Sequence, residues 1–449
     1  MAGTTHTSAE LRAFATGVVR RLAEAGFRAV FAGGCVRDML LELQPQDYDV
    51  ATSATPDRIQ ALFPRNVSVG VAFGVVCVLS DGESPMQVEV ATFRGETTYS
   101  DGRHPDRVCF TDEVEDVKRR DFTVNGLLFD PLKNEVLDHV GGRRDLERKV
   151  IRAIGDPKRR FEEDRLRMLR AVRFASALGF EIDGLCLSAI KEYASGITVI
   201  SAERIRDELS GMLTGPNSRR AFELLKKTRL LKHILPEVEA LEGVPQPAQF
   251  HPEGDVWQHT LALLEGLDRA PLTLAWGVLL HDVGKPPTLE RADRIRFNEH
   301  ERVGAEMTAR IMARLKYSNE ETERVLDLVR QHMVFKDAHH MRPATLKRFL
   351  RQPHFDEHLE LHRLDCLASH GSLEAYDFCT AELQKQSVET LRPPPLLTGS
   401  DLIALGLTPG PQFKTILSAV EDRQLEGTLR DKEEALKYVR ERLATRNEG

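Results

Sequence analysis

The sequence has no long apolar run, few cysteines and only a modest excess of charge, and each shortage excludes a class of protein. No apolar stretch of its 449 residues reaches the ~18–20 residues that a helix needs to cross a bilayer. The six cysteines include no CxxC pair, so we predict reduced, mostly buried thiols rather than a disulfide ladder or a zinc ribbon. With 41% hydrophobic and 29% charged residues, the composition is typical of a soluble globular protein.

The first residues lack the charged-then-apolar order of a signal peptide, which favours a cytoplasmic location with no membrane partner. The net charge of −7 does not indicate a nucleic-acid binder, but basic residues gather over residues 118–173. This pattern suggests a basic groove on an acidic protein, and a salt-bridged helix surface is the alternative.

The chain changes from a mixed pattern to a helical one near residue 158, which predicts the α+β fold class. From apolar patterning, strands are predicted at 28–33, 48–52, 73–80 and 86–93. With helices between these strands, residues 1–157 are predicted to form a small α/β head with a mixed sheet.

Two proline-rich stretches, at 235–255 and 393–395, divide the helical part of the chain. We therefore predict a helical neck at 158–240, a second helical domain at 250–385 and a helical tail at 396–449.

Three acidic residues near the predicted strands are candidate magnesium ligands. Asp47 and Asp49 alternate with Tyr48, so both carboxylates point to one face of a strand. Glu89 lies on the polar face of the strand at 86–93 and can supply a third carboxylate. Two Mg²⁺ ions held by this set would activate a 3′-hydroxyl and neutralise the leaving pyrophosphate. The alternatives are a surface loop for the aspartates and an ordinary exposed position for Glu89.

A glycine pair, Gly33 and Gly34, follows the first predicted strand. A turn of this kind lets backbone N–H groups approach phosphate, and Arg37 can reach the same charge. The alternatives are a simple tight turn for the glycines and a pairing of Arg37 with Asp38 at the helix start.

Three motifs follow one another along this part of the chain: GGCVRDMLLELQPQDYDVATSATP at 33–56, RRDFTVN at 119–125 and EEDRLRMLRAVRFA at 162–175. In this order and spacing they resemble the class II tRNA nucleotidyltransferase and bacterial poly(A) polymerase family, within the polymerase-beta-like superfamily. The resemblance covers residues 28–240 and implies a head, neck, body and tail. It implies an enzyme that adds CMP and AMP, from CTP and ATP, to tRNA 3′ ends without a template and with release of pyrophosphate.

The resemblance also implies roles for single residues, with Asp47, Asp49 and Glu89 holding Mg²⁺ at the catalytic centre. The nucleotide-binding residues that it implies are Gly33, Gly34, Arg37, Arg120, Asp121, Asn125, Asp164, Arg167 and Arg170. Arg120 would hold phosphate, and Asp121 would accept a hydrogen bond from a ribose 2′-hydroxyl. A fold-stabilising acceptor at a turn is the alternative for Asp121.

Asp164 and Arg167 match the motif with which the family selects bases. Three positions apart on a predicted helix, they would share a face. A carboxylate accepts from the exocyclic amine of cytosine or adenine, whereas uracil and guanine would leave it facing a carbonyl. A helix laced by salt bridges is the alternative. On the next predicted helix, Arg204 and Glu208 are four positions apart, which predicts an exposed pair.

The segment 95–118 resembles the flexible loop of the family. The matching residues are Glu96, Tyr99, Asp101, Arg103 and Pro105. Members that add only CC have a shorter loop, so the resemblance implies competence to add the terminal A. The Arg-rich element of bacterial poly(A) polymerases is not evident, which favours tRNA CCA addition over poly(A) tailing. An enzyme that adds only A is the remaining alternative.

Histidines and aspartates recur in the second helical domain in the order H…HD…H…H…D, which resembles the HD phosphohydrolase superfamily. The resemblance implies a divalent transition-metal site with the ligands His259, His281, Asp282 and Asp365 and the possible further ligands or phosphate-binding residues His300 and His332. A metal-bound water would hydrolyse 2′,3′-cyclic phosphates or phosphomonoesters at damaged tRNA ends. The alternatives are an inactive scaffold, or an HD phosphohydrolase whose head only binds RNA.

The C-terminal residues resemble the tail that grips the tRNA elbow in this family. The expected partners are therefore the acceptor end and elbow of tRNA, together with CTP and ATP.

Overall fold

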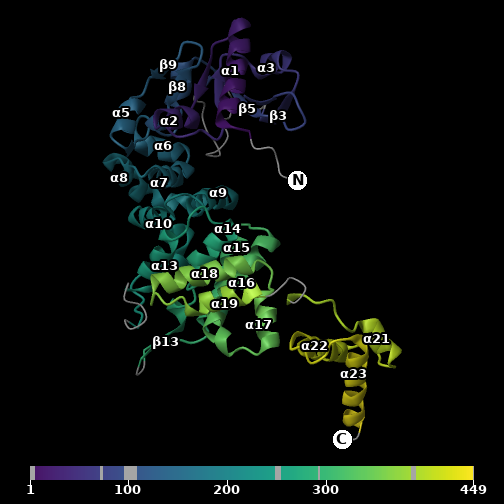
Figure 1. The fold of residues 1–449 in the computed structure, drawn as a ribbon. Helices are drawn as coiled ribbons and strands as arrows, with labels where there is room; N and C mark the ends of the chain where they lie inside the picture. The colour runs from purple at the N-terminus through teal and green to yellow at the C-terminus, as the bar shows by residue number, and fades with distance from the viewer. Residues whose placement is uncertain are drawn as a thin grey trace. The chain divides into compact units, whose positions relative to one another are not determined.

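The computed structural model divides into two compact units, residues 1–239 and 240–449 (Figure 1). The residues that it describes are 6–70, 74–95, 109–247, 254–291, 294–385 and 391–447. Within the described residues, no helix is both long and apolar enough to span a bilayer. The five cysteines described with their side chains, all except Cys109, are buried and free, as the sequence predicts.

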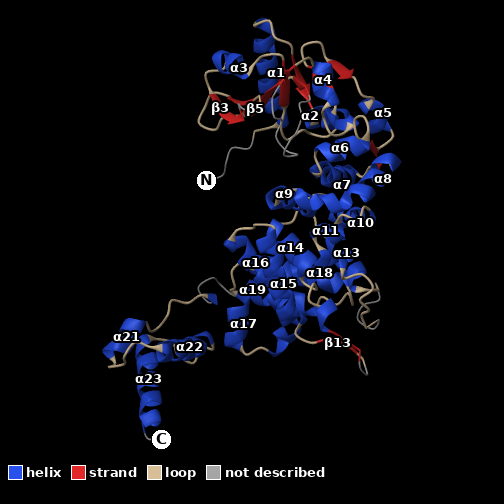
Figure 2. Cartoon of the chain, turned by 180° about the vertical axis from the view of Figure 1, so that it is seen from behind, coloured by secondary structure: helices blue, strands red, loops and turns tan. Residues whose placement is uncertain are grey.

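A seven-stranded mixed sheet forms the centre of the head, in the order β3-β4-β5-β2-β1-β8-β9. Figure 2 shows strands of this sheet in red, with α1 and α3 beside them. Its strands are β1 Ala29–Ala32, β2 Asp49–Thr52, β3 Asn66–Gly70, β4 Val75–Leu79, β5 Gln87–Thr92, β8 Leu127–Asp130 and β9 Glu135–Asp138. Neighbouring strands are antiparallel except β2 and β5, which are parallel. Sequence patterning predicts four of the seven; β3, β8 and β9 are additional.

The helices of the head are α1 Ser8–Glu24, α2 Gly34–Leu40, α3 Pro56–Leu62, α4 Glu113–Lys118 and α5 Gly142–Glu147. Helix α1 begins with a capping box between Thr7 and Glu10 and buries an apolar stripe that includes Val18 and Leu22. It packs on β1, β2 and β5, beside α3. Because α1 and α3 cover one face of the sheet, polar residues of the strands lie on the other face.

The neck consists of short helices in the same compact unit as the head. They are α6 Pro157–Glu163, α7 Leu166–Leu178, α8 Gly184–Tyr193, α9 Ala202–Leu213, α10 Ser218–Lys227, α11 Leu231–Ile234 and α12 Pro236–Glu239. Gly179 ends α7 in the left-handed conformation, with φ of 67°, where glycine avoids the steric cost of a Cβ. The prediction of one helix through Asp164 is wrong. The helical conformation is interrupted between α6 and α7 at Asp164, which has an extended φ of −145°.

The second unit is helical, apart from a small hairpin of β12 Leu289–Arg291 and β13 Ile295–Phe297. Its main helices are α13 Val256–Glu265, α14 Leu272–Leu280, α15 His300–Arg314, α16 Asn319–Gln331, α17 Pro343–Leu350, α18 Phe355–Ala368 and α19 Glu374–Lys385. Every residue of α14 is buried except Leu272, and the helix packs against α13, α16 and α18. A helix that is apolar all round belongs inside a bundle.

The tail consists of α21 Gly399–Ala404, α22 Pro411–Leu425 and α23 Lys432–Asn447, which share an apolar cluster of their own around Leu402 and Val420. The α+β class with a mixed-sheet head and helical remainder is confirmed. The division into four domains at the predicted boundaries stays a prediction.

Candidate functional site

The head places two of the candidate acids on adjacent parallel strands. Val50 of β2 pairs with Val90 of β5, so the preceding residues, Asp49 and Glu89, lie side by side. Glu89 is exposed between buried valines, and its side chain therefore points away from the face that α1 covers.

Asp47 lies just before β2, on the same side as Asp49. The ring of Tyr48 between them is buried and packs edge-on against Phe31, with centroids 5.3 Å apart. Because the Tyr48 side chain points to the face that α1 covers, both aspartates point the other way. They are exposed, with Glu89, on the face of the sheet that α1 and α3 leave uncovered, called the open face below. The structure thus brings the three predicted acids together.

The electrostatics of Asp49 reflect this crowding. The pKa of Asp49 is raised to about 6: burial of the carboxyl group is the largest cause, the negative charges of Asp47 and Glu89 also raise it, and Arg120 opposes the rise. Three oxygen-rich side chains that repel one another form a donor set suited to a hard divalent cation. Their role as Mg²⁺ ligands stays a prediction.

The glycine turn brings a guanidinium group to the catalytic face. Gly33 has φ of 77°, and a Cβ there would lie 3.2 Å from Nη1 of Arg120. Glycine therefore suits both the backbone conformation and the close approach of the guanidinium group. The N–H of Gly33 donates to the carbonyl of Leu127, so it is not available to phosphate. Arg37 donates to Asp38 and to Oδ1 of Asn125, each over 2.8 Å.

Asp121 joins the head motif to the neck. Its carboxylate accepts from Arg170 of α7 over 2.7 Å, from Nδ2 of Asn125 and from the backbone N–H of Phe122. Burial would raise the pKa of Asp121, but the charge of Arg170 and these hydrogen bonds outweigh it and lower the pKa. Asp121 is thus held as an ionised acceptor. Both the predicted contact with a ribose 2′-hydroxyl and the alternative, a fold-stabilising contact at a turn, require this state.

The base-selecting candidates are held by separate partners. Asp164 accepts from the backbone N–H of Leu166 with Oδ1, and forms an ion pair with Arg204 through Oδ2 over 2.8 Å. Arg167 donates to Glu163 over 2.6 Å and to the backbone carbonyl of Arg119 over 3.1 Å. Since Asp164 precedes α7, the prediction that Asp164 and Arg167 share a helix face is wrong. The break makes Asp164 a capping residue instead.

The predicted exposed pair of Arg204 and Glu208 is also wrong. Glu208 is buried and accepts from Arg173 of α7 over 2.7 Å, while Arg204 turns to Asp164. Arg173 and Glu208 thus form a contact between α7 and α9 that the sequence reasoning missed. The sequence contains a signal for this contact. Arg170 and Arg173 are three positions apart, so they lie on one face of α7, and such a pair of cations requires an acid from a neighbouring helix.

The second unit gathers its histidines around a common centre. The Nδ1–H groups of His281, His300 and His332 each donate to the carbonyl three residues earlier, over 2.9, 2.9 and 2.7 Å. This bond occupies Nδ1, so Nε2 is the nitrogen of each ring that is left to face the centre. The Nε2 atoms of His300 and His332 are 3.2 Å apart. His332 lies at the start of a 3₁₀ segment, η5 His332–His340.

The six candidate ligands of this unit form two groups of three, each with ligand atoms within 4.8 Å of one another. The first group is His259, His281 and Asp365, and the second is Asp282, His300 and His332. Asp282 lies between the groups, with Oδ2 3.2 Å from Nε2 of His281 and Oδ1 3.5 Å from Nε2 of His300. Lys285 also contacts Oδ2 of Asp282, over 2.7 Å.

The protonation states fit a metal centre. The pKa of His332 is lowered to about 3, mainly by burial and also by the neighbouring charges of His281 and His300. Burial opposes the ionisation of Asp282 and Asp365, yet the surrounding histidines hold both pKa values well below the usual range. Neutral imidazole and ionised carboxylate are the states that bind metal. A cavity of about 380 Å³ lined by Phe297, Met333 and His370, among others, reaches this cluster.

Comparison with known proteins now places the chain. Family models match three successive parts: the poly A polymerase head domain at 29–152, the probable RNA and SrmB-binding site of polymerase A at 179–241, and the HD domain at 255–364. The CCA-adding enzyme of Enterococcus faecalis is 34% identical over 426 residues, which cover 93% of this chain and 93% of that protein. The chain belongs to the CCA-adding enzyme family.

Other relatives match over a shorter length. The CCA-adding enzyme of Lactobacillus helveticus is 43% identical over 254 residues, which are 55% of this chain and 62% of that protein. The chain thus spans less than two thirds of that relative. The solved structure of the Bacillus stearothermophilus CCA-adding enzyme in complex with CTP has a TM-score of 0.73 and 28% identity, and the match covers 97% of this chain and 98% of that one.

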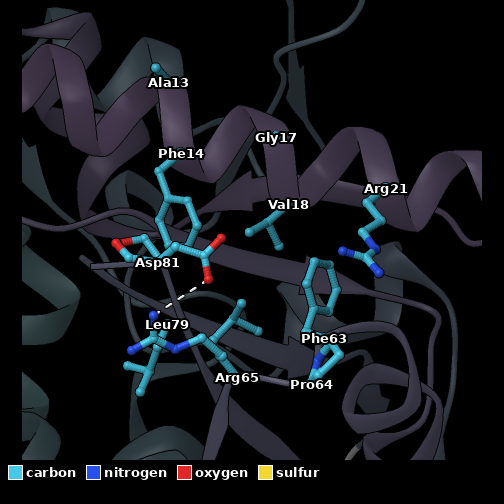
Figure 3. Close-up of a pocket in the computed structure, with 12 residues that line it drawn as sticks. Ala13, Phe14, Gly17, Val18, Arg21, Phe63, Pro64, Arg65, Leu79 and Asp81 are labelled. Atoms are coloured by element: carbon cyan, nitrogen blue, oxygen red, sulfur yellow. Dashed lines mark hydrogen bonds and ion pairs between the residues drawn. The ribbon is translucent and has the colours of Figure 1, made fainter. Parts of the chain in front are cut away.

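A cavity elsewhere in the head contains none of the candidate site residues. Its volume is about 690 Å³, and it lies between α1 and β4, next to the turn that follows α3. Figure 3 shows Phe14 and Val18 of α1 facing Phe63 across it, with an ion pair between Arg65 and Asp81 at the rim. The candidate loop residues Glu96, Tyr99, Asp101, Arg103 and Pro105 lie outside the described residues.

The crowding of carboxylates predicts a pH-dependent effect of Asp49→Asn on stability without metal. The folded pKa of Asp49, about 6, lies above its ordinary value of 3.8, so ionisation of this group opposes folding once the pH exceeds both values. We expect the metal-free variant to have a higher Tm than the parent near pH 8. The difference should be much smaller near pH 4, where the folded protein keeps Asp49 protonated and the pH is close to the ordinary pKa of 3.8. Thermal scans at both pH values measure this.

The control is Asp81→Asn, since Asp81 is fully exposed at the rim of the other cavity. An equal Tm for parent and Asp49→Asn at pH 8 would contradict the assigned repulsion.

Proposed function

We propose that this chain is a template-independent nucleotidyltransferase that adds CMP and AMP, from CTP and ATP, to the 3′ ends of tRNA. The observation that carries the proposal is the set of three carboxylates, Asp47, Asp49 and Glu89, on one open face beside the Gly33–Arg120 contact. Membership of the CCA-adding enzyme family supports it, as does likeness to a structure described as a complex with CTP. A cytoplasmic location stays a prediction.

Asp47, Asp49 and Glu89 would hold Mg²⁺, which would supply activation of the tRNA 3′-hydroxyl and charge neutralisation on the departing pyrophosphate. Arg120 and Arg37 flank the glycine turn and would bind the triphosphate electrostatically. These groups align the attacking oxygen, the α-phosphate and the leaving group, and phosphoryl transfer needs little beyond this alignment.

Asp164 and Arg167 would select the base. Arg204 and the N–H of Leu166 orient the Asp164 carboxylate, with lone pairs left to accept from an exocyclic amine. Glu163 fixes the guanidinium group of Arg167, which would donate to ring acceptors. Uracil and guanine would place a carbonyl against the carboxylate, so two acceptors would face each other and a hydrogen bond would be lost, which costs about 1–3 kcal/mol.

The direct test is incubation of tRNA lacking CCA with labelled CTP, ATP or both. We expect CTP alone to add two residues, and both nucleotides together to add three before extension stops. Asp47→Ala and Asp49→Ala should abolish incorporation of both nucleotides at unchanged fold, because each removes a metal ligand. A long A ladder would support a poly(A) polymerase instead, and full activity of either variant would overturn the metal assignment.

Asp164→Ala and Arg167→Ala are predicted to relax base choice, so that UTP or GTP becomes competitive with CTP. The loss of discrimination should be roughly tenfold or more, as expected when one buried polar contact is removed. Competition assays with all four nucleotides measure it. As a control, Asp207→Ala changes an acid that pairs only locally with Arg206 on the neighbouring helix. Unchanged selectivity in both site variants would remove these residues from base recognition.

We also propose a second, metal-dependent phosphohydrolase site in the HD domain. It is supported by the inward-facing Nε2 atoms of His281, His300 and His332 and by the position of Asp282 between two ligand groups. The Nε2 atoms of His300 and His332 are 3.2 Å apart, close enough for one cation to be bound by both. Imidazole with carboxylate suits Mn, Ni, Co or Fe. The bound metal would supply an activated water, and the adjoining cavity would admit a phosphate ester.

For this site we predict two equivalents of Mn²⁺ per chain after loading and removal of loosely bound ions, as measured by elemental mass spectrometry. His332→Ala should retain one equivalent, because it disrupts only the second group. It should also lose hydrolysis of 2′,3′-cyclic AMP. The exposed neighbour His340 provides the control His340→Ala, which should behave as the parent. A parent protein that retains no transition metal would refute the site while leaving nucleotide addition untouched.

A further inference from the structure

Phe174 of α7 lies among three guanidinium groups. Their carbon atoms are 4.6 Å from the ring centroid for Arg173, 5.1 Å for Arg170 and 5.5 Å for Arg37. A cation within about 6 Å of an aromatic ring face is attracted by the ring quadrupole. One neutral side chain therefore contacts three cations that come from two separate segments, α7 and α2.

The ring is fixed by the motif that carries Asp121. Phe174 packs edge-on against Phe122, with centroids 5.9 Å apart and an interplanar angle of 79°. Phe122 is fully buried and directly follows Asp121, which accepts from Arg170. The ring position, and with it the positions of the guanidinium groups, is thus tied to the core of the head.

The three arginines line the region of the proposed triphosphate. Arg37 follows the glycine turn and contacts Asn125, and Arg170 contacts Asp121. Arg173 pairs with Glu208, whose carboxylate lies 2.7 Å from its Nε. Each guanidinium group has its own acid partner, and a group that faces all three cations can hold them together against their mutual repulsion. An aromatic face does this, because it carries no net charge that an incoming polyanion must displace.

We propose that Phe174 is a positioning residue that preorganises Arg37, Arg170 and Arg173 for the triphosphate of the incoming nucleotide. The inference rests on the proposed nucleotidyltransferase function, and it adds Arg173 to the groups that receive the phosphates. Phe174 itself touches neither substrate nor metal. Its contribution should therefore appear in nucleotide affinity, equally for CTP and ATP, and not in base choice.

The test compares Phe174→Leu and Phe174→Met, which keep an apolar side chain without a π face, with Phe174→Tyr, which restores the face. Equilibrium dialysis with labelled CTP gives Kd, and competition by inorganic triphosphate gives the affinity for the phosphate chain alone. We expect both affinities to fall roughly tenfold in the Leu and Met variants, with Phe174→Tyr close to the parent. In turnover assays KM should rise by a similar factor, with kcat nearly unchanged.

The matched control is Phe27→Leu, a half-buried phenylalanine of the same head that has no role in the site. It reports the effect of losing a ring on stability alone, as thermal scans measure. Unchanged triphosphate affinity in folded Leu and Met variants would overturn the proposal, and so would weakened CTP binding with unchanged triphosphate binding. Because dialysis needs no turnover, a parent that binds CTP but adds nothing to tRNA would reject the proposed function separately.

Discussion

The candidate site of the head is built on three carboxylates that one face of a sheet holds close together, so that they repel one another. The parallel pairing of β2 with β5 sets Asp49 beside Glu89, and the buried ring of Tyr48 leaves Asp47 on the same side. Folding alone does not relieve this repulsion, and the raised pKa of Asp49 reflects it. A divalent cation would relieve it, so the site couples the stability of the head to the ion that the proposed chemistry needs.

Around this acidic face the protein places cations that are themselves restrained. Arg120 lies against Gly33, Arg170 is bound by Asp121, and Arg167 is bound by Glu163. A network in which each charge already has a partner costs little reorganisation when a polyanionic ligand arrives. The same principle recurs in the HD domain, where backbone carbonyls fix each histidine before any metal is bound.

Much of this arrangement was readable from local patterns. Alternation around Glu89 gave the strand and the exposed side chain, and the Asp-x-Asp spacing gave the shared direction of Asp47 and Asp49, because strand periodicity is a local property. The break at Asp164 was missed because helical spacing of apolar residues continues through it, and only the capping contacts reveal it. The pairing of Glu208 with Arg173 was also missed, since contacts between helices depend on tertiary packing that helix spacing does not specify.

The most direct measurement of the central claim is a crystal structure of the protein with CTP and Mn²⁺ in place of Mg²⁺, with the metal located by anomalous scattering. The account predicts a peak in the head, within coordination distance of Asp47, Asp49 and the CTP phosphates, on the face that also carries Glu89. A nucleotide bound elsewhere, or a head without a peak at these carboxylates, would contradict it.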